Sequence, residues 1–108
     1  MAYDEDLVDD VRMLLADEPD VTEKKMFGSL AFLAGGSIAV AVSGRGGLMV
    51  RVDRAQRADL LRLDHVEPIV MRGRETTGFV RVLEGGLATD DGLRDWVERG
   101  LAAARAAS

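Results

Sequence analysis

The sequence contains no cysteine, so neither a disulfide framework nor a thiolate metal site can form. It contains one histidine, His65, which excludes a metal cluster or a catalytic pair built on two histidines. Its aromatic residues (one Trp, one Tyr, three Phe) are too few to form a platform for stacked nucleic-acid bases. We therefore expect no metal, no cofactor and no catalytic residues.

A long apolar segment is also lacking. The longest stretch free of charged residues, 26–44, is interrupted by Gly28, Gly35 and Gly36, which favours a hairpin over a membrane helix. The first residues are acidic, whereas a secretion signal begins with basic residues and continues with apolar ones. These features predict a soluble, cytoplasmic protein with no membrane association.

The net charge of −5 is unevenly distributed along the chain. Residues 1–23 hold nine acidic side chains and one base, Arg12, whereas residues 24–83 hold ten bases and five acids. The acidic total argues against non-specific binding of nucleic acid, which needs many contacts of lysine or arginine with phosphates. The basic middle keeps a local nucleic-acid site open as an alternative. The simpler interpretation is that its arginines lie on solvated faces.

Helical periodicity predicts a helix at the beginning, in the middle and at the end of the chain. The first covers about residues 4–16, and the second begins after the N-cap Asp53 and ends near Leu63. The inner face of the second helix is expected to be small, consisting of Ala55, Ala58 and Leu61. The third follows Thr89 and has an apolar stripe made of Leu93, Trp96, Val97, Gly100, Leu101 and Ala104. We expect Trp96 to be largely buried.

Alternation of apolar and polar residues predicts the strands. The early segments 22–27, 30–33, 38–42 and 48–52 give three strands, or four if none of them merge, and the later segments are 66–71 and 78–83. A polar turn is expected over residues 72–77, and Pro68 places its strand at an edge or at a bulge. The predicted order is helix, three strands, helix, two strands, helix, in one α+β domain over residues 1–108.

Several segments resemble a known family. The first is 21–33, which includes Met26-Phe27-Gly28, and the second is 86–90 followed by Leu93-Arg94 and Trp96-Val97. Between them, Met71-Arg72-Gly73 and Gly78-Phe79-Val80 also fit. In order, and over nearly the whole chain, these segments resemble the N-terminal domain of the TfoX competence-regulator family.

The resemblance implies a two-layer fold, an antiparallel sheet with helices on one face, of the kind shared with secretion chaperones. That agrees with the order of elements predicted from periodicity. It also implies a regulatory role, because better-known members assist transcription of competence genes alongside the cyclic-AMP receptor protein. Full-length members add a helical C-terminal domain, and this sequence ends where that domain would begin. We accordingly expect a stand-alone N-terminal domain.

The segment around Met26-Phe27-Gly28 has two interpretations. In the first, Phe27 packs in the core and Gly28 allows a bend or a bulge. In the second, the lysines that precede Met26 present a basic and apolar surface to a partner. Arginines near the last two strands would join that surface if the sheet brings them together. The candidate partner-binding residues are Lys24, Lys25, Met26, Arg72, Arg74 and Arg81.

No motif supports catalysis. Gly44-Arg45-Gly46-Gly47 precedes a strand, so it predicts a hairpin turn rather than a phosphate-binding loop, which precedes a helix. A serine paired with His65 or with a lysine remains an alternative, but no nucleophile-elbow motif is present. We predict a non-enzymatic module that binds another protein or itself, as a two-fold homodimer through the sheet or a helix face. A nucleic-acid-associated factor and a small enzyme are the alternatives.

Overall fold

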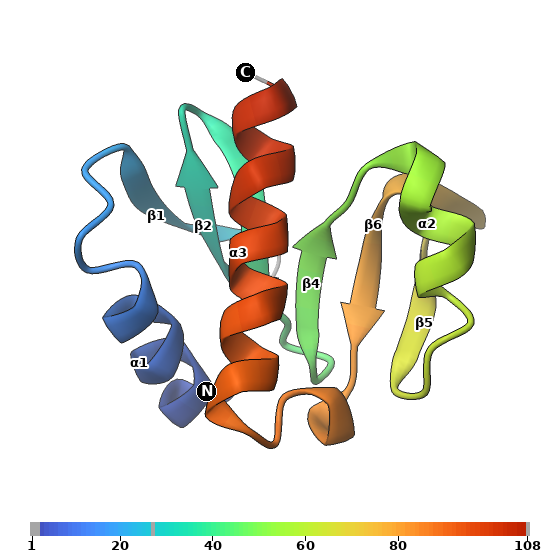
Figure 1. Ribbon diagram of the computed structural model, residues 1–108, viewed down its shortest axis with the longest axis horizontal. Helices are drawn as coiled ribbons and strands as arrows, with labels where there is room; N and C mark the ends of the chain where they lie inside the picture. The colour runs from blue at the N-terminus through green and yellow to red at the C-terminus, as the bar shows by residue number, and fades with distance from the viewer. Residues whose placement is uncertain (1–2, 27, 108) are drawn as a thin grey trace.

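The computed structural model describes residues 3–26 and 28–107 (Figure 1). Its elements are, in order, α1 (Glu5–Leu14), β1 (Val21–Met26), β2 (Ser29–Ala34), β3 (Ser37–Val42), β4 (Leu48–Arg51), α2 (Arg54–Leu60), β5 (Val66–Met71), β6 (Arg74–Val82), a 3-10 turn (Glu84–Gly86) and α3 (Asp90–Ala107). The α+β class is confirmed. Four strands precede α2, so none of the four early segments merge and the strand number is four rather than three. Phe27, which was expected in the core, lies outside the described residues.

The strands form one antiparallel sheet of six, in the order β1-β2-β3-β4-β6-β5. Strand β6 inserts between β4 and β5, so β1 and β5 are the two edges. In Figure 1, α3 runs in front of the central strands, with α1 on one side of it and α2 on the other. The three helices therefore lie on one side of the sheet.

The core lies between the sheet and α3. Alternate residues of the strands point toward the helix, and those completely or almost completely buried include Phe32, Val40, Val42, Leu48, Val50, Val80 and Val82. The helix contributes Leu93, Val97, Leu101 and Ala104 to the same cluster. Each large aliphatic side chain buried in this way stabilises the fold by about 1.5–3 kcal/mol. The apolar stripe predicted for the last helix thus forms one wall of the core.

Side chains cap the three helices at their N-termini. Asp4 Oδ1 accepts hydrogen bonds from the backbone N–H groups of Asp6 and Leu7, at 2.9 and 3.2 Å. Asp53 caps α2 and Thr89 caps α3, as the sequence predicts, each accepting one backbone hydrogen bond. Such a cap contributes about 1 kcal/mol. The caps explain why the helices begin where they do.

Trp96 is less buried than the other members of the predicted stripe, with a side chain that is only partly buried. It packs against the core cluster without being part of it, and the Arg99 guanidinium lies 5.5 Å from the centre of its ring. At Gly100, one turn further along the helix, α3 lies so close to β3 that a Cβ would meet the backbone of Ala39. Trp96 consequently lies at the margin of the core, beside the 3-10 turn.

The inner face of α2 also differs from the prediction. Ala55 and Ala58 are exposed, whereas Leu60 is buried and the Arg57 side chain retains 17% of its exposure. A leucine buries more apolar area than an alanine, so this short helix turns Leu60 toward the sheet. The helix ends at Leu60, earlier than the predicted Leu63.

The turn between the last two strands is shorter than the predicted turn over residues 72–77. Arg72 and Gly73 both have positive φ, 53° and 78°, as a two-residue hairpin turn requires. Strand β6 therefore begins at Arg74 rather than at Gly78. As expected, Pro68 lies in an edge strand and next to a register shift in its pairing.

Replacing Gly100 with alanine tests the contact between α3 and β3. An ideal Cβ at this position would lie 2.5 Å from the carbonyl oxygen of Ala39 and 2.8 Å from Val40 Cγ1. The backbone oxygen cannot move aside alone, so we expect Gly100→Ala to lower the free energy of unfolding by about 1–3 kcal/mol. Urea denaturation measures it. Glu98→Ala, at an exposed position of the same helix, should have little effect. A more stable Gly100→Ala variant would contradict the described contact.

A second prediction concerns pH. Arg105 Nη2 donates to Asp20 Oδ1 at 2.8 Å and to Glu18 Oε1 at 3.2 Å, joining the end of α3 to the segment before β1. The hydrogen bond from Arg105 lowers the pKa of Asp20. The stabilisation by the Asp20–Arg105 contact is therefore complete above about pH 4, the pKa of an aspartate in the unfolded chain. It is lost as pH falls through the lower pKa of Asp20 in the folded protein.

We expect Arg105→Gln to lower the urea midpoint at pH 7, and this difference from the unmodified protein should shrink between pH 4 and pH 2. Arg94→Gln is the control, because Arg94 is an exposed arginine of the same helix. A difference that stays constant across this pH range would show that the Asp20 contact does not contribute through its charge.

Candidate interaction surface

The structure does not bring the predicted partner-binding residues together. Lys24, Lys25 and Met26 lie in the edge strand β1, whereas Arg72 and Arg74 lie at the hairpin between β5 and β6. Strands β2, β3 and β4 separate β1 from β6, and β5 is the opposite edge. These candidate residues therefore do not form one patch in the fold. The role of these residues in partner binding stays a prediction.

The two lysines of β1 point to opposite sides of the sheet. Lys25 pairs with Leu30, which belongs to the core, so it lies on the side of the helices. Glu23 lies on that side too, where it accepts hydrogen bonds from Arg12 of α1 at 2.8 Å. Lys24 lies between them in the strand and pairs with Ala31, so it lies on the side away from the helices.

Arg81 is held by the hairpin between β3 and β4. Its Nη1 donates to Ser43 Oγ at 2.7 Å and to the carbonyl oxygen of Gly46 at 2.8 Å, and its Nε lies 3.7 Å from Glu67 Oε1. These bonds fasten the hairpin to β6, and the Arg81 side chain keeps only 16% of its exposure. Its structural role was not predicted, because Ser43 and Arg81 are far apart in the sequence.

The side of the sheet away from the helices is the open face. Strand pairing aligns one residue of each strand in a row across it, which we call the open-face row: Lys24, Ala31, Ala41, Met49, Arg81 and Glu67. The two alanines are buried but do not belong to the core cluster under α3, as expected for residues of the other face. The row thus has an apolar centre between charged ends.

A second set of open-face residues lies beside this row. Leu33 pairs with Ile38, and both side chains are half-buried. Arg51 pairs with Phe79, and its guanidinium lies 4.7 Å from the centre of the ring. Arg51 also donates to the carbonyl oxygen of Ile38, and burial lowers the pKa of its guanidinium. The apolar character of the open face therefore extends beyond the open-face row.

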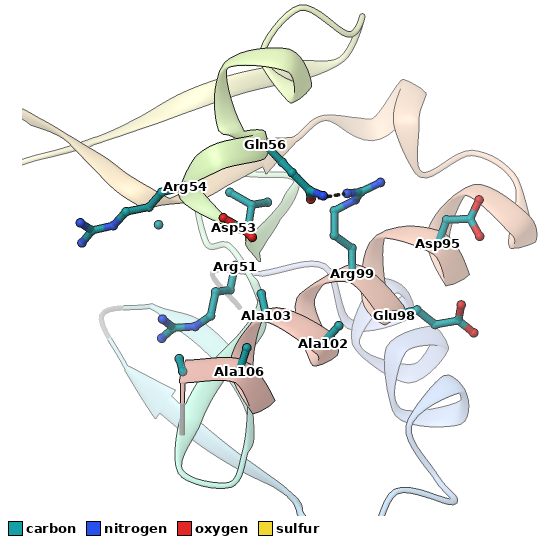
Figure 2. Close-up of a pocket in the computed structure, with 13 residues that line it drawn as sticks. Arg51, Asp53, Arg54, Gln56, Asp95, Glu98, Arg99, Ala102, Ala103 and Ala106 are labelled. Atoms are coloured by element: carbon teal, nitrogen blue, oxygen red, sulfur yellow. Dashed lines mark hydrogen bonds between the residues drawn. The ribbon is translucent and has the colours of Figure 1, made fainter.

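A cleft of about 830 Å³ lies on the helix side, between the start of α2 and the second half of α3 (Figure 2). Its charged side chains diverge: Arg54 points to one side, Asp95 and Glu98 point to the other, and Arg51 is directed toward Phe79 and the carbonyl oxygen of Ile38. Arg99 instead donates to Gln56 Oε1 at 3.1 Å. A ligand site needs polar groups that converge on one place, so we do not regard this cleft as the main candidate.

Two of the serines considered for catalysis are held by structural hydrogen bonds. Ser29 Oγ accepts from the backbone N–H of Gly44, and Ser43 Oγ accepts from Arg81. The exposed His65 ring lies against Gly85. In residues 3–26 and 28–107, no group of three or more His, Asp or Glu side chains is placed to hold a metal ion. No helix in the same ranges is long and apolar enough to cross a membrane.

Comparison with known families gives a match that covers nearly all of this fold. The model of the TfoX N-terminal domain family matches residues 13–104, from the end of α1 into the last turn of α3. The chain belongs to this family. Every strand of the sheet, and with it the open face of this TfoX N-terminal domain, lies within the matched residues. No curated protein and no solved structure matches the chain.

The separation of the basic residues predicts weak binding to DNA. A labelled duplex titrated at about 50 mM salt should give a dissociation constant above about 100 μM, the weak end of non-specific binding. The unmodified protein is compared with a Lys24→Gln/Lys25→Gln variant and an Arg72→Gln/Arg74→Gln variant. Binding in the low micromolar range that falls steeply with salt, and that both variants weaken, would contradict this prediction and support the nucleic-acid alternative.

Proposed function

We propose that this TfoX N-terminal domain is a non-enzymatic regulatory module that binds a protein through the open face of its sheet. The observation that carries the proposal is the apolar centre of that face. Ala31, Ala41 and Met49 occupy the middle of the open-face row, and Leu33 and Ile38 lie beside them. The helices lie on the other side of the sheet (Figure 1).

The composition of β2 and β3 supports this proposal. An antiparallel strand with one face in water alternates apolar and polar residues, whereas a strand covered on both faces is apolar throughout. The sequences of β2 and β3, SLAFLA and SIAVAV, have no charged residue on either face. By contrast, β1 (VTEKKM) carries three charges. The two strands have the composition of strands that are covered on both faces.

Family membership supports a regulatory role, and we extend the proposal to regulation of transcription in the cytoplasm. The module would act by contact with a protein rather than with DNA, because Lys24 and Lys25 lie in the edge strand β1, far from Arg72 and Arg74 at the β5–β6 hairpin. The non-enzymatic part of the proposal is supported by the diverging charges of the cleft between α2 and α3.

A photo-crosslinking amino acid placed on the open face tests the proposal. With a benzophenone side chain at position 49, irradiation of living cells should give a defined adduct of higher mass. The same side chain at position 13 is the control, because Met13 lies on α1 and keeps 77% of its exposure. An adduct from position 49 but not from position 13 is the expected result, since binding and not exposure should decide the yield.

Equal adduct yields from the two positions would contradict the proposal, because crosslinking would then follow exposure alone. A defined adduct from position 13 with none from position 49 would move the binding surface to α1. The mass of the adduct also separates two kinds of partner, since a second copy of this chain adds 11.7 kDa.

A further inference from the structure

We infer that the open face is covered by a second copy of this chain, packed face to face about a two-fold axis along the strands between β3 and β4. This inference rests on the proposed function, since it names the occupant of the same face. It adds the orientation of the two copies and the residues that meet between them. The order of residues in the open-face row carries it.

The open-face row has a cation at one end and an anion at the other. Lys24 lies in the edge strand β1, is exposed, and has no ion pair within the described residues. Glu67 lies in the edge strand β5, and its side chain keeps 49% of its exposure. Its contact with Arg81 is long, at 3.7 Å. Both charged groups are thus accessible to a second molecule.

The sizes of the side chains also differ between the two halves of the row. Ala31 and Ala41 lie on the β1 side of its centre, and the larger Met49 and Arg81 lie on the β5 side. Arg81 is bonded toward the β3–β4 hairpin, so its guanidinium is already occupied. Near its centre, the row therefore has small side chains in the half toward β1 and large side chains in the half toward β5.

Two sheets that pack face to face can be related by a two-fold axis along the strands or across them. An axis along the strands reverses the order of the row. Lys24 then faces the partner's Glu67, and Met49 faces the partner's Ala41. An axis across the strands keeps the order, so Lys24 would face the partner's Lys24 and Met49 the partner's Met49. Charge and size both select the axis along the strands.

Twist in the two sheets does not remove this match. Aligned sheets cross at roughly 30°, which displaces facing residues most at the edges and least at the centre. The centre holds the size-matched pair of Met49 and the partner's Ala41. The edges hold Lys24 and Glu67, whose long side chains span several ångströms of displacement.

The size of the face sets the expected strength of the dimer. Six strands spaced about 4.8 Å apart and roughly five residues long give a flat area on the order of 400 Å². Projecting side chains add to this area. A standard interface buries about 800 Å² on each partner, so we expect a weak dimer with a dissociation constant of about 10–100 μM. Such a dimer exchanges readily, which suits a regulatory module.

Sedimentation equilibrium on charge-exchanged variants tests the orientation. Lys24→Glu alone and Glu67→Lys alone each place like charges together at two symmetric positions. Each should raise the dissociation constant about tenfold. The double variant exchanges both charges and should return to within about twofold of the unmodified protein. Lys25→Glu is the control, because it reverses the neighbouring charge of the same strand on the helix side. It should leave the dissociation constant unchanged within about twofold.

Met49→Glu completes the set and should raise the dissociation constant at least about 100-fold, because it buries a charge at the centre of the interface. Circular dichroism shows whether each variant is folded. If Met49→Glu does not fold, Met49→Gln replaces it, with an expected rise of about tenfold.

Three results would overturn the inference, each in a different way. A monomer at every concentration up to about 1 mM would exclude a second copy, yet the proposed function would survive if position 49 still crosslinks to a different protein. A dimer that Met49→Glu leaves intact would exclude the open face as the interface. A dimer that Met49→Glu dissociates, but that responds equally to the Lys24 and Lys25 variants, would exclude the orientation alone.

Discussion

The contact between Gly100 of α3 and the backbone of β3 determines how the two layers of this protein meet. Because Gly100 has no side chain, the helix approaches the carbonyl oxygen of Ala39 more closely than any other residue type would permit. Val97 and Leu101 then reach the core from either side of that contact. The N-terminal cap at Thr89 and the ion pair of Arg105 with Asp20 hold the two ends of the same helix.

This arrangement assigns different roles to the two faces of the sheet. One helix of 18 residues lies over its centre, and the two shorter helices lie beside it on the same side. The other face has an apolar centre, although its ends carry Lys24 and Glu67. An apolar centre between charged ends resembles the composition of protein interfaces, which have an apolar core and a polar rim.

Local features of the fold could be predicted from the sequence. Asp53 and Thr89 are predicted and observed as caps, and Pro68 is found at an edge strand beside a register shift, because each depends on neighbouring residues only. Burial was harder to predict. Trp96 has the spacing of a core residue, but its position at the margin depends on tertiary packing beside the 3-10 turn, which spacing along the helix does not reveal.

The candidate surface could be predicted only in part. Lys24 was among the expected partner-binding residues, but the distinction between Lys24 and Lys25 depends on strand register, which periodicity alone does not provide. The insertion of β6 between β4 and β5 was not predictable from the order of elements. That insertion places Arg81 next to Met49 and completes the open-face row. The alanines of the row gave no signal by themselves, since small residues are common in buried strands.

The central claim is that a second copy of this chain covers the open face. Methyl NMR spectra of the methionine-labelled protein, recorded over a dilution series from about 1 mM to 10 μM, test it most directly. The account predicts that the methyl signal of Met49 moves with concentration, while that of the far more exposed Met13 on α1 stays fixed. Movement of the Met13 signal with a stationary Met49 signal would contradict the account and place the association on the helix side.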